Sequence, residues 1–496
     1  MTDQGNGQPS GPINRWKTLD KDLGRVAQLE QASAAISRPM VAIGISIVFV
    51  LVCGLAALGL TGQGSGTAII VAAAVFGAYM ALNIGANDVA NNMGPAVGAN
   101  ALSMGGALII AAVFETAGAL IAGGDVVSTI SGGIVAPSAV ADPDTFIWAM
   151  MAALIASALW LNLATWFGAP VSTTHSIVGG VMGAGIVAAG FGAVQWATMG
   201  QIAASWIISP ILGGAIAALF LAFIKAFIND VPDKLAAARR WVPLLIGIMA
   251  GSFTAYLAMK GLKKVVDIRL DQALLMGLAV GIAVTFVMRP LVRRQSEGME
   301  NRKRSLKQLF GMPLIISAAL LSFAHGANDV ANAVGPLAAI VHAVQDAGTS
   351  ERVTIPLWVM MIGAAGISFG LMLFGPKLIR MVGQEITKLN QLRAFCVALS
   401  ASITVIVASA LGLPVSSTHI AVGAVFGVGF YREWEAERRA RILNLQKGKP
   451  LTAEERKRRK LVRRSHVLGI GAAWVITVPA TAVLSALLFL GMNRLF

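Results

Sequence analysis

The sequence predicts an all-α integral membrane protein with about 9–12 transmembrane helices, arranged as two inverted repeats that each hold a broken helix and a re-entrant hairpin. Composition is the first observation: 56% of the 496 residues are hydrophobic, 13% are charged, and the mean hydropathy is +0.73. These values are typical of a chain in lipid and exclude a water-soluble multidomain protein. The second observation is a series of apolar stretches long enough to cross a bilayer core of about 30 Å. The third is a pair of polar motifs that each occur twice.

The net charge of +15 lies almost entirely outside the apolar stretches. Residues 39–224 contain no Lys or Arg, whereas the segments 289–308 and 432–464 carry +5 and +8. Basic loops beside long apolar spans follow the positive-inside rule, so both loops are expected on the cytoplasmic side. The positive charge therefore indicates orientation in a bilayer, and no nucleic-acid partner is expected.

The remaining composition excludes several classes of site. Cys53 and Cys396 both lie in apolar stretches and offer neither a disulfide framework nor a metal-ligand spacing. The segment 1–38 is polar, carries both signs of charge and does not resemble a signal peptide, so we expect it in the cytoplasm. We expect a multi-pass protein of the inner or plasma membrane that uses no cofactor.

Two different motifs repeat in the same order. NIGANDVAN at Asn83–Asn91 is echoed by HGANDVAN at His325–Asn332, and a Gly-Pro pair follows each copy. PVSTTH at Pro170–His175 is echoed by PVSSTH at Pro414–His419. The offsets between copies are 241 and 244 residues. Because two unrelated motifs recur at nearly one separation, the chain is an internal duplication.

The charges around the second motif pair predict how the halves are related. Residues 394–431 lie between two basic flanks, so this segment starts and ends in the cytoplasm and is predicted to be a re-entrant hairpin with PVSSTH at its tip. The flanks of the first copy hold no basic residue, so that hairpin is expected to open outward. Inverted halves with matching polar segments are typical of secondary transporters, which bind substrate near the midplane.

These predictions divide the chain into four parts: a polar cytoplasmic segment, 1–38; a first transmembrane half, 39–223, whose repeat begins at about 67; a linker with two extra spans and a basic cytoplasmic loop, 224–308; and a second transmembrane half, 309–496, which includes the basic loop 432–464.

Each hairpin tip is expected to begin a helix inside the membrane. Proline suits the first helical turn, and serine or threonine supplies a capping oxygen. The free backbone N–H groups and the positive end of the helix dipole attract anions at such a terminus. The hydroxyl groups expected to bind a substrate anion belong to Ser172, Thr173, Thr174, Ser416, Ser417 and Thr418.

The GANDVAN segments place carboxylates and amides inside membrane spans. A buried carboxylate is costly in lipid, and one in each copy indicates a functional pair. The glycines and prolines around each segment predict a local break in the helix that frees carbonyl oxygens for cations. We expect the coupling cation at Asp88, Asn91, Asp329 and Asn332, with the two aspartates as ligands if the cation is Na⁺, and the substrate anion at Asn87 and Asn328.

The signs of these charges predict symport. Two helix dipoles of about half a charge each cannot balance an anion while two carboxylates stay ionised beside it. No Lys or Arg lies in the spans of the first half to do so. A cation must therefore enter with the anion, either Na⁺ on the oxygens or H⁺ on the acids.

Four further ionisable residues are candidates. Glu115 lies mid-span and is a third acid for cation coupling, and no charged residue near 356–359 matches it in the second half. His325 faces Asp329 at i+4. For His175, His419 and His325, a proton relay and a structural role both remain open.

The paired GANDVAN and P-V-S-[ST]-T-H motifs, with the central basic loop, closely resemble the inorganic phosphate transporter (Pit/PiT) family over about residues 67–491. The resemblance implies cation-coupled uptake of inorganic phosphate by alternating access, with substrate and ions held at the two motif types. It also implies frequent homodimers. The sequence departs from a uniform repeat in that Asn83-Ile84 stands in the first copy where the second has its histidine, and Asn92 adds an amide.

The sequence bears on three other functions. A symporter for sulfate or another tetrahedral oxyanion is the nearest, because sulfate offers the same oxygens, although acids in the site favour phosphate, which can donate a proton. An anion channel does not account for buried acids or inverted halves. An intramembrane enzyme is not expected, because no HExxH, GxSxG or P-loop pattern lies on a span.

Overall fold

The computed structural model describes most of the chain from residue 40 onward. The described residues are 40–62, 64, 66–140, 142–167, 171–262, 265–346, 353, 355–385, 389–447 and 464–495. The predicted N-terminal segment 1–38 and residues 448–463 of the second basic loop lie outside them.

Within these residues the protein is helical, and its one β-bridge joins Val135 to Val194. Eleven helices in the described part of the chain are long and apolar enough to cross a membrane, which agrees with the predicted number. The first of them is Met40–Thr61. The elements that follow it are α2 (Thr67–Gly98), α3 (Met104–Ala122), α4 (Gly124–Ser128), α5 (Pro143–Phe167), α6 (Thr173–Ala189), α7 (Trp196–Ile224), α8 (Lys234–Lys260), α9 (Leu270–Gln295), α10 (Lys303–Leu309), α11 (Gly311–Asp329), α12 (Ala331–Asp346), α13 (Leu357–Glu385), α14 (Gln391–Ala410), α15 (Ser417–Lys447) and α17 (Arg464–Leu495). Among the eleven, α10, α11 and α12 count as one span, Lys303–Gln345.

The helices begin where the sequence supplies capping side chains. The side chain of Ser103 accepts from the backbone N–H of Gly106 at the start of α3, and Asp233 and Asn390 cap α8 and α14 in the same way. These side chains satisfy N–H groups that have no partner inside the helix. In the spans, leucines, isoleucines and valines remain exposed on the protein surface, as expected of side chains that face lipid.

The predicted break in the GANDVAN helix is limited to one residue of the second copy. There α11 ends at Asp329 and α12 begins at Ala331, while Val330 between them keeps right-handed helical backbone angles and donates its N–H to the carbonyl of Gly326. In the first copy, α2 runs without interruption from Thr67 to Gly98. Glycine lowers helix propensity by only about 1 kcal/mol, and Pro95 lies in the last turn of α2, where a lost hydrogen bond does little damage. The prediction was therefore wrong for the first copy.

Both PVS-T-H motifs open a helix that folds back on the preceding one. α5 packs against α6, and α14 packs against α15. α6 begins at Thr173, and Ser172 caps it by accepting from the backbone N–H of His175. With 17 residues, α6 is shorter than a typical membrane span.

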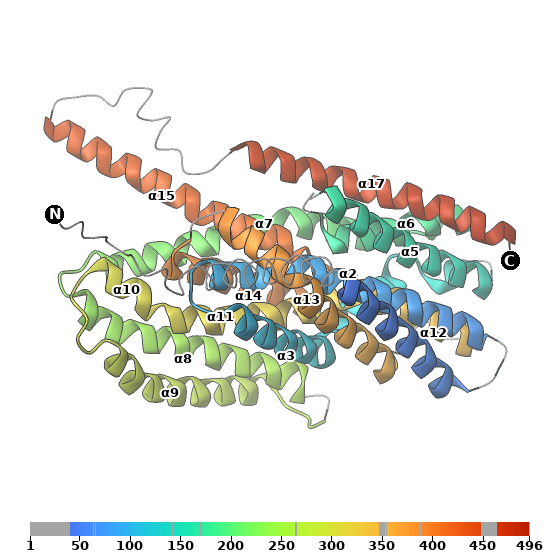
Figure 1. Cartoon of the computed structure of the whole chain (residues 1–496), viewed down its shortest axis with the longest axis horizontal. Coiled ribbons are helices and arrows are strands. Elements are labelled where there is room, and N and C mark those ends of the chain that lie inside the picture. Colours follow the sequence, from blue (N-terminus) through green and yellow to red (C-terminus); the bar gives the residue numbers. More distant parts are fainter. Residues whose placement is uncertain are drawn as a thin grey trace, which may run out of the picture. The chain divides into compact units, whose positions relative to one another are not determined.

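Helix packing follows the duplication. α2 packs on α13, and its counterpart α11 packs on α3; likewise α7 packs on α15, and α17 on α6. The pair α8 and α9, which lies outside the repeated part, packs side by side (Figure 1). The four-part division of the chain and its orientation in the bilayer stay predictions.

Two matched close approaches hold these helix pairs together. A Cβ atom at Gly370 on α13 would overlap the carbonyl oxygen of Leu82 on α2, and one at Gly118 on α3 would overlap that of Phe323 on α11. Only glycine permits the backbones to come so close.

We expect Gly370→Ala to lower the thermal unfolding midpoint of the purified protein, because overpacking a tight helix contact costs about 1–3 kcal/mol. Gly105→Ala on α3 is the control, since its added methyl group meets no atom within 4 Å. Unfolding in detergent, followed by tryptophan fluorescence, measures both. Equal midpoints for the two variants would contradict the role of the close approach.

Candidate functional site

The four motifs come together in one buried cluster. α2 and α11 carry the aspartates, and the first turns of α6 and α15 carry the hydroxyl groups. Asp88 is 1% exposed and Asp329 is fully buried. A carboxylate hidden from water is stable only where hydrogen bonds or cations replace its hydration.

Asp88 accepts hydrogen bonds from both hairpin tips. The Thr173 hydroxyl lies 3.0 Å from its Oδ2, and the Thr418 hydroxyl lies 3.0 Å from its Oδ1. The amide of Asn87 adds a third donor at 3.1 Å.

Asp329 is held in the equivalent way. The Ser417 hydroxyl donates to its Oδ2 at 2.9 Å, and the Thr174 hydroxyl lies 3.3 Å from its Oδ1. Thr173 and Ser417 occupy matching places in the two tips, as do Thr174 and Thr418. Each carboxylate therefore accepts from one residue of each matched pair, and the two copies of the motifs form a single site.

The asparagines connect the helices to the tips. Asn91 donates to the Thr418 hydroxyl at 2.8 Å, and its counterpart Asn332 donates to Thr174 at 3.2 Å and to Thr173 at 3.3 Å. The Oδ1 atom of Asn332 is a buried acceptor without a hydrogen-bond partner in the described part of the chain. An acceptor of this kind fits a cation.

The two asparagines predicted to bind substrate contact hairpin backbone. Asn328 accepts from the N–H of Val415 at 3.2 Å and donates to the carbonyl of Leu413 at 3.1 Å. Asn87 lies 3.4 Å from the carbonyl of Val171. These side chains fix the tips against α2 and α11.

Ser172 and Ser416 use their hydroxyl oxygens locally. Each accepts from the backbone N–H three residues later, at 3.2 Å and 3.3 Å, and so caps its own helix. Of the six predicted hydroxyl groups, the other four face the aspartates.

The two tip histidines meet each other. The rings of His175 and His419 lie 4.6 Å apart, and the ring of Trp206 from α7 lies 3.8 Å from His175. The indole N–H of Trp206 donates to the carbonyl of Pro414 at 2.9 Å. Sequence reasoning missed Trp206, which no motif marks. The contacts favour the structural role for both histidines.

His325 joins the two aspartates to Glu115. Its Nε2 lies 2.9 Å from Asp329 and 3.7 Å from Asp88, and its Nδ1 lies 3.3 Å from Glu115 Oε1. Asn92 donates to the same Glu115 oxygen at 2.9 Å. Thus Glu115, predicted as a third acid, does lie beside the aspartate pair, and Asn92 is an added member.

The centre of the cluster suits a cation. One ligand atom from each of Asp88, His325 and Asp329 lies within 4.8 Å of the others, and all three side chains are buried. Two carboxylates, four hydroxyl groups and several amides can hold a cation by their oxygens and an oxyanion by their O–H and N–H donors.

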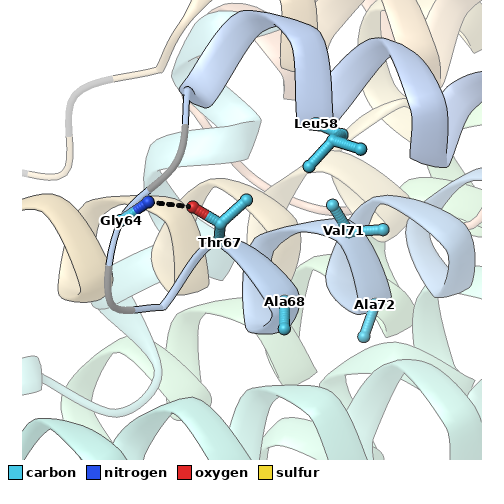
Figure 2. A pocket seen from close by; sticks show the side chains of 6 residues that line it. All are labelled: Leu58, Gly64, Thr67, Ala68, Val71 and Ala72. Carbon is cyan, nitrogen blue, oxygen red and sulfur yellow. Dashed lines mark hydrogen bonds between the residues drawn. The ribbon is translucent and has the colours of Figure 1, made fainter.

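A groove elsewhere on the surface does not have this chemistry. It is lined by Leu58, Gly64, Thr67, Ala68, Val71 and Ala72, which follow one another closely along the chain (Figure 2). The Thr67 hydroxyl is already engaged by Gly64 and Gly62. This apolar lining suits hydrocarbon rather than an anion.

The chain is similar to known proteins over most of its length. The model of the Phosphate transporter family matches residues 84–485. A protein named putative phosphate permease from Helicobacter pylori strain J99 is 45% identical over 95% of this chain and 99% of its own. Inorganic phosphate transporter 2-1, chloroplastic, from Arabidopsis thaliana is 37% identical over 83% of this chain and 70% of its own.

A solved structure has the same fold. It is described as the sodium-dependent phosphate transporter, is 35% identical, and matches with a TM-score of 0.78 over 86% of this chain and all of its own. With eleven apolar helices among the described residues and a family match over most of its length, the chain is a multi-pass membrane protein that belongs to the phosphate transporter family.

Proposed function

We propose that this protein is a secondary active transporter that takes up inorganic phosphate together with a cation, Na⁺ or H⁺. The observation that carries the proposal is the pair of buried aspartates, each hydrogen-bonded by hydroxyl groups of both hairpin tips. The names of the relatives support phosphate as the substrate, and the name of the solved structure supports Na⁺ as the cation.

The chemistry of the site explains why a cation is needed. Phosphate binds through oxygens that accept hydrogen bonds, and the donors at the tips now point at Asp88 and Asp329. An incoming anion can take over these hydroxyl groups only if the carboxylates gain another partner. A cation on the carboxylate oxygens provides that partner and cancels the repulsion between like charges.

The matched contacts of the two copies support alternating access. Thr418 donates to Asp88, and its counterpart Thr174 donates to Asp329, so each tip touches the helices of both copies. In an inverted repeat, two such halves can exchange conformations and open the shared site to opposite sides of the membrane in turn.

Uptake into proteoliposomes tests the proposal. We expect radiolabelled phosphate to accumulate above equilibrium when a Na⁺ or a pH gradient is imposed separately, and excess unlabelled sulfate to compete weakly. Phosphate flux that is independent of both gradients would contradict symport. Accumulation of sulfate in preference to phosphate would assign the other tetrahedral oxyanion.

A further inference from the structure

The polar cluster is asymmetric at one place, and helix packing identifies the asymmetry. Gly326 presses on the backbone of Glu115, and its counterpart Gly85 presses on the backbone of Ile367. Gly118 follows Glu115 at the same spacing as Gly370 follows Ile367, and Gly118 and Gly370 make the matched helix contacts described above. Ile367 is therefore the structural counterpart of Glu115.

The neighbours of Glu115 have apolar counterparts as well. By the offset of the GANDVAN motifs, Ile84 corresponds to His325, and Ala333 corresponds to Asn92. All three apolar counterparts, Ile84, Ala333 and Ile367, are buried. The same place in the fold can thus be filled by hydrocarbon, so packing alone does not explain Glu115, His325 and Asn92. We call these three residues the Glu115 network.

Two oxygen atoms of the Glu115 network lack a hydrogen-bond donor among the described residues. Glu115 is 1% exposed and Asn92 is fully buried, yet Glu115 Oε2 and Asn92 Oδ1 have no hydrogen-bond partner among the described residues. Leaving a buried acceptor unpaired costs about 1–3 kcal/mol, and more for a charged group. Two such oxygens on adjoining side chains point to a ligand that both would bind.

A proton on His325 does not satisfy these oxygens. Its Nδ1 lies 3.3 Å from Glu115 Oε1, which already accepts from Asn92. A proton on Nδ1 would therefore donate to Oε1 and leave Oε2 without a partner. The imidazole also lies between Glu115, Asp329 and Asp88, and one positive charge cannot balance three carboxylates. The missing partner is a positive ion that accepts carboxylate and amide oxygens as ligands.

We propose that Glu115 and Asn92 form a separate Na⁺ site beside the Asp88–Asp329 pair, present in one copy of the repeat only. The site carries a single carboxylate of its own, which matches a monovalent ion. The inference rests on the proposed cation symport and adds to it: the number of Na⁺ ions bound exceeds by one the number held at the matched aspartates.

Binding of radioactive ²²Na⁺ to the purified full-length protein, without phosphate, tests the site. We expect Glu115→Gln to bind one Na⁺ fewer per chain than the wild-type protein. Asn92→Ala removes the unpaired amide oxygen together with the amide N–H that donates to Glu115, and it is expected to raise the half-saturating Na⁺ concentration at least fivefold. Ile367→Val, at the counterpart position, is the matched control and should bind as the wild-type protein does.

A second readout separates this site from a structural role. In proteoliposomes loaded for dual-label flux, Glu115→Gln should lower the number of Na⁺ ions moved per phosphate, whereas a merely structural defect lowers both fluxes together. An unchanged Na⁺ number in Glu115→Gln, or binding of protons without Na⁺ in the wild-type protein, overturns the inference. If Glu115→Gln does not fold, an unchanged half-saturating concentration in Asn92→Ala overturns it.

These outcomes stay distinct from failure of the proposed function. Absence of gradient-driven phosphate uptake by the wild-type protein would refute symport itself. Intact symport with wild-type Na⁺ binding in Glu115→Gln would refute only the additional site.

Discussion

Asp88→Asn and Asp329→Asn are each expected to reduce cation-coupled phosphate uptake at least about 100-fold while the protein still reaches the membrane. Each substitution keeps the size of the side chain and removes the negative charge that would hold the cation. It also replaces one acceptor oxygen by an N–H₂ group that faces a donor hydroxyl. Losing a charge-assisted partner in a buried site costs about 3 kcal/mol, which corresponds to about 100-fold.

Initial rates of radiolabelled phosphate uptake, normalised to the amount of protein in the membrane, measure this effect. Asp142→Asn is the control, since this exposed carboxylate caps the first turn of α5 through Thr145. Hydrogen bonds from the side chain and backbone of Thr145 hold the pKa of Asp142 below its usual value, so this carboxylate is charged at neutral pH. Wild-type rates in the two site variants would refute the role of the aspartates.

Thr174→Val and Thr418→Val are expected to raise the half-saturating phosphate concentration about tenfold or more, and by similar factors. Valine has the shape of threonine but lacks the hydroxyl group that donates to the aspartate of the other copy. A hydrogen bond to a charged group contributes about 1.5–3 kcal/mol, which corresponds to about 10–100-fold.

Thr174→Ser and Thr418→Ser are the controls for these variants, because serine restores the donor and loses only a methyl group. We expect both to bind phosphate nearly as the wild-type protein does. Concentration-dependent uptake gives all four values. A strong effect at one position and none at its counterpart would show that the two copies do not contribute equally to the site.

Much of the site could be predicted from sequence because its residues stand in repeated motifs. Asp88 and Asp329 are conspicuous as carboxylates in apolar spans, and the tip hydroxyl groups follow from proline and serine at a helix start. The structure brings these groups together, although Thr418 and Asp88 are 330 residues apart. The roles of these residues in binding stay predictions.

Other members of the cluster carry no signal of this kind. Trp206 stands in an apolar helix, and only the packing of α7 on α15 brings it to the tip histidines. The helix break was expected twice and occurs once, because glycines in the sequence lower helix propensity without dictating where a backbone opens.

The amino-acid sequence was sufficient for the class of protein, the duplication and the paired acids, since these depend on composition and on motifs that recur along the chain. Tertiary structure decided which hydroxyl faces which carboxylate, and that Glu115 has Ile367 as its counterpart. The reason is physical: the register between α3 and α11, and between α13 and α2, is set by glycine contacts between backbones. Such contacts depend on how distant helices fit together, and no local pattern in the chain encodes that fit.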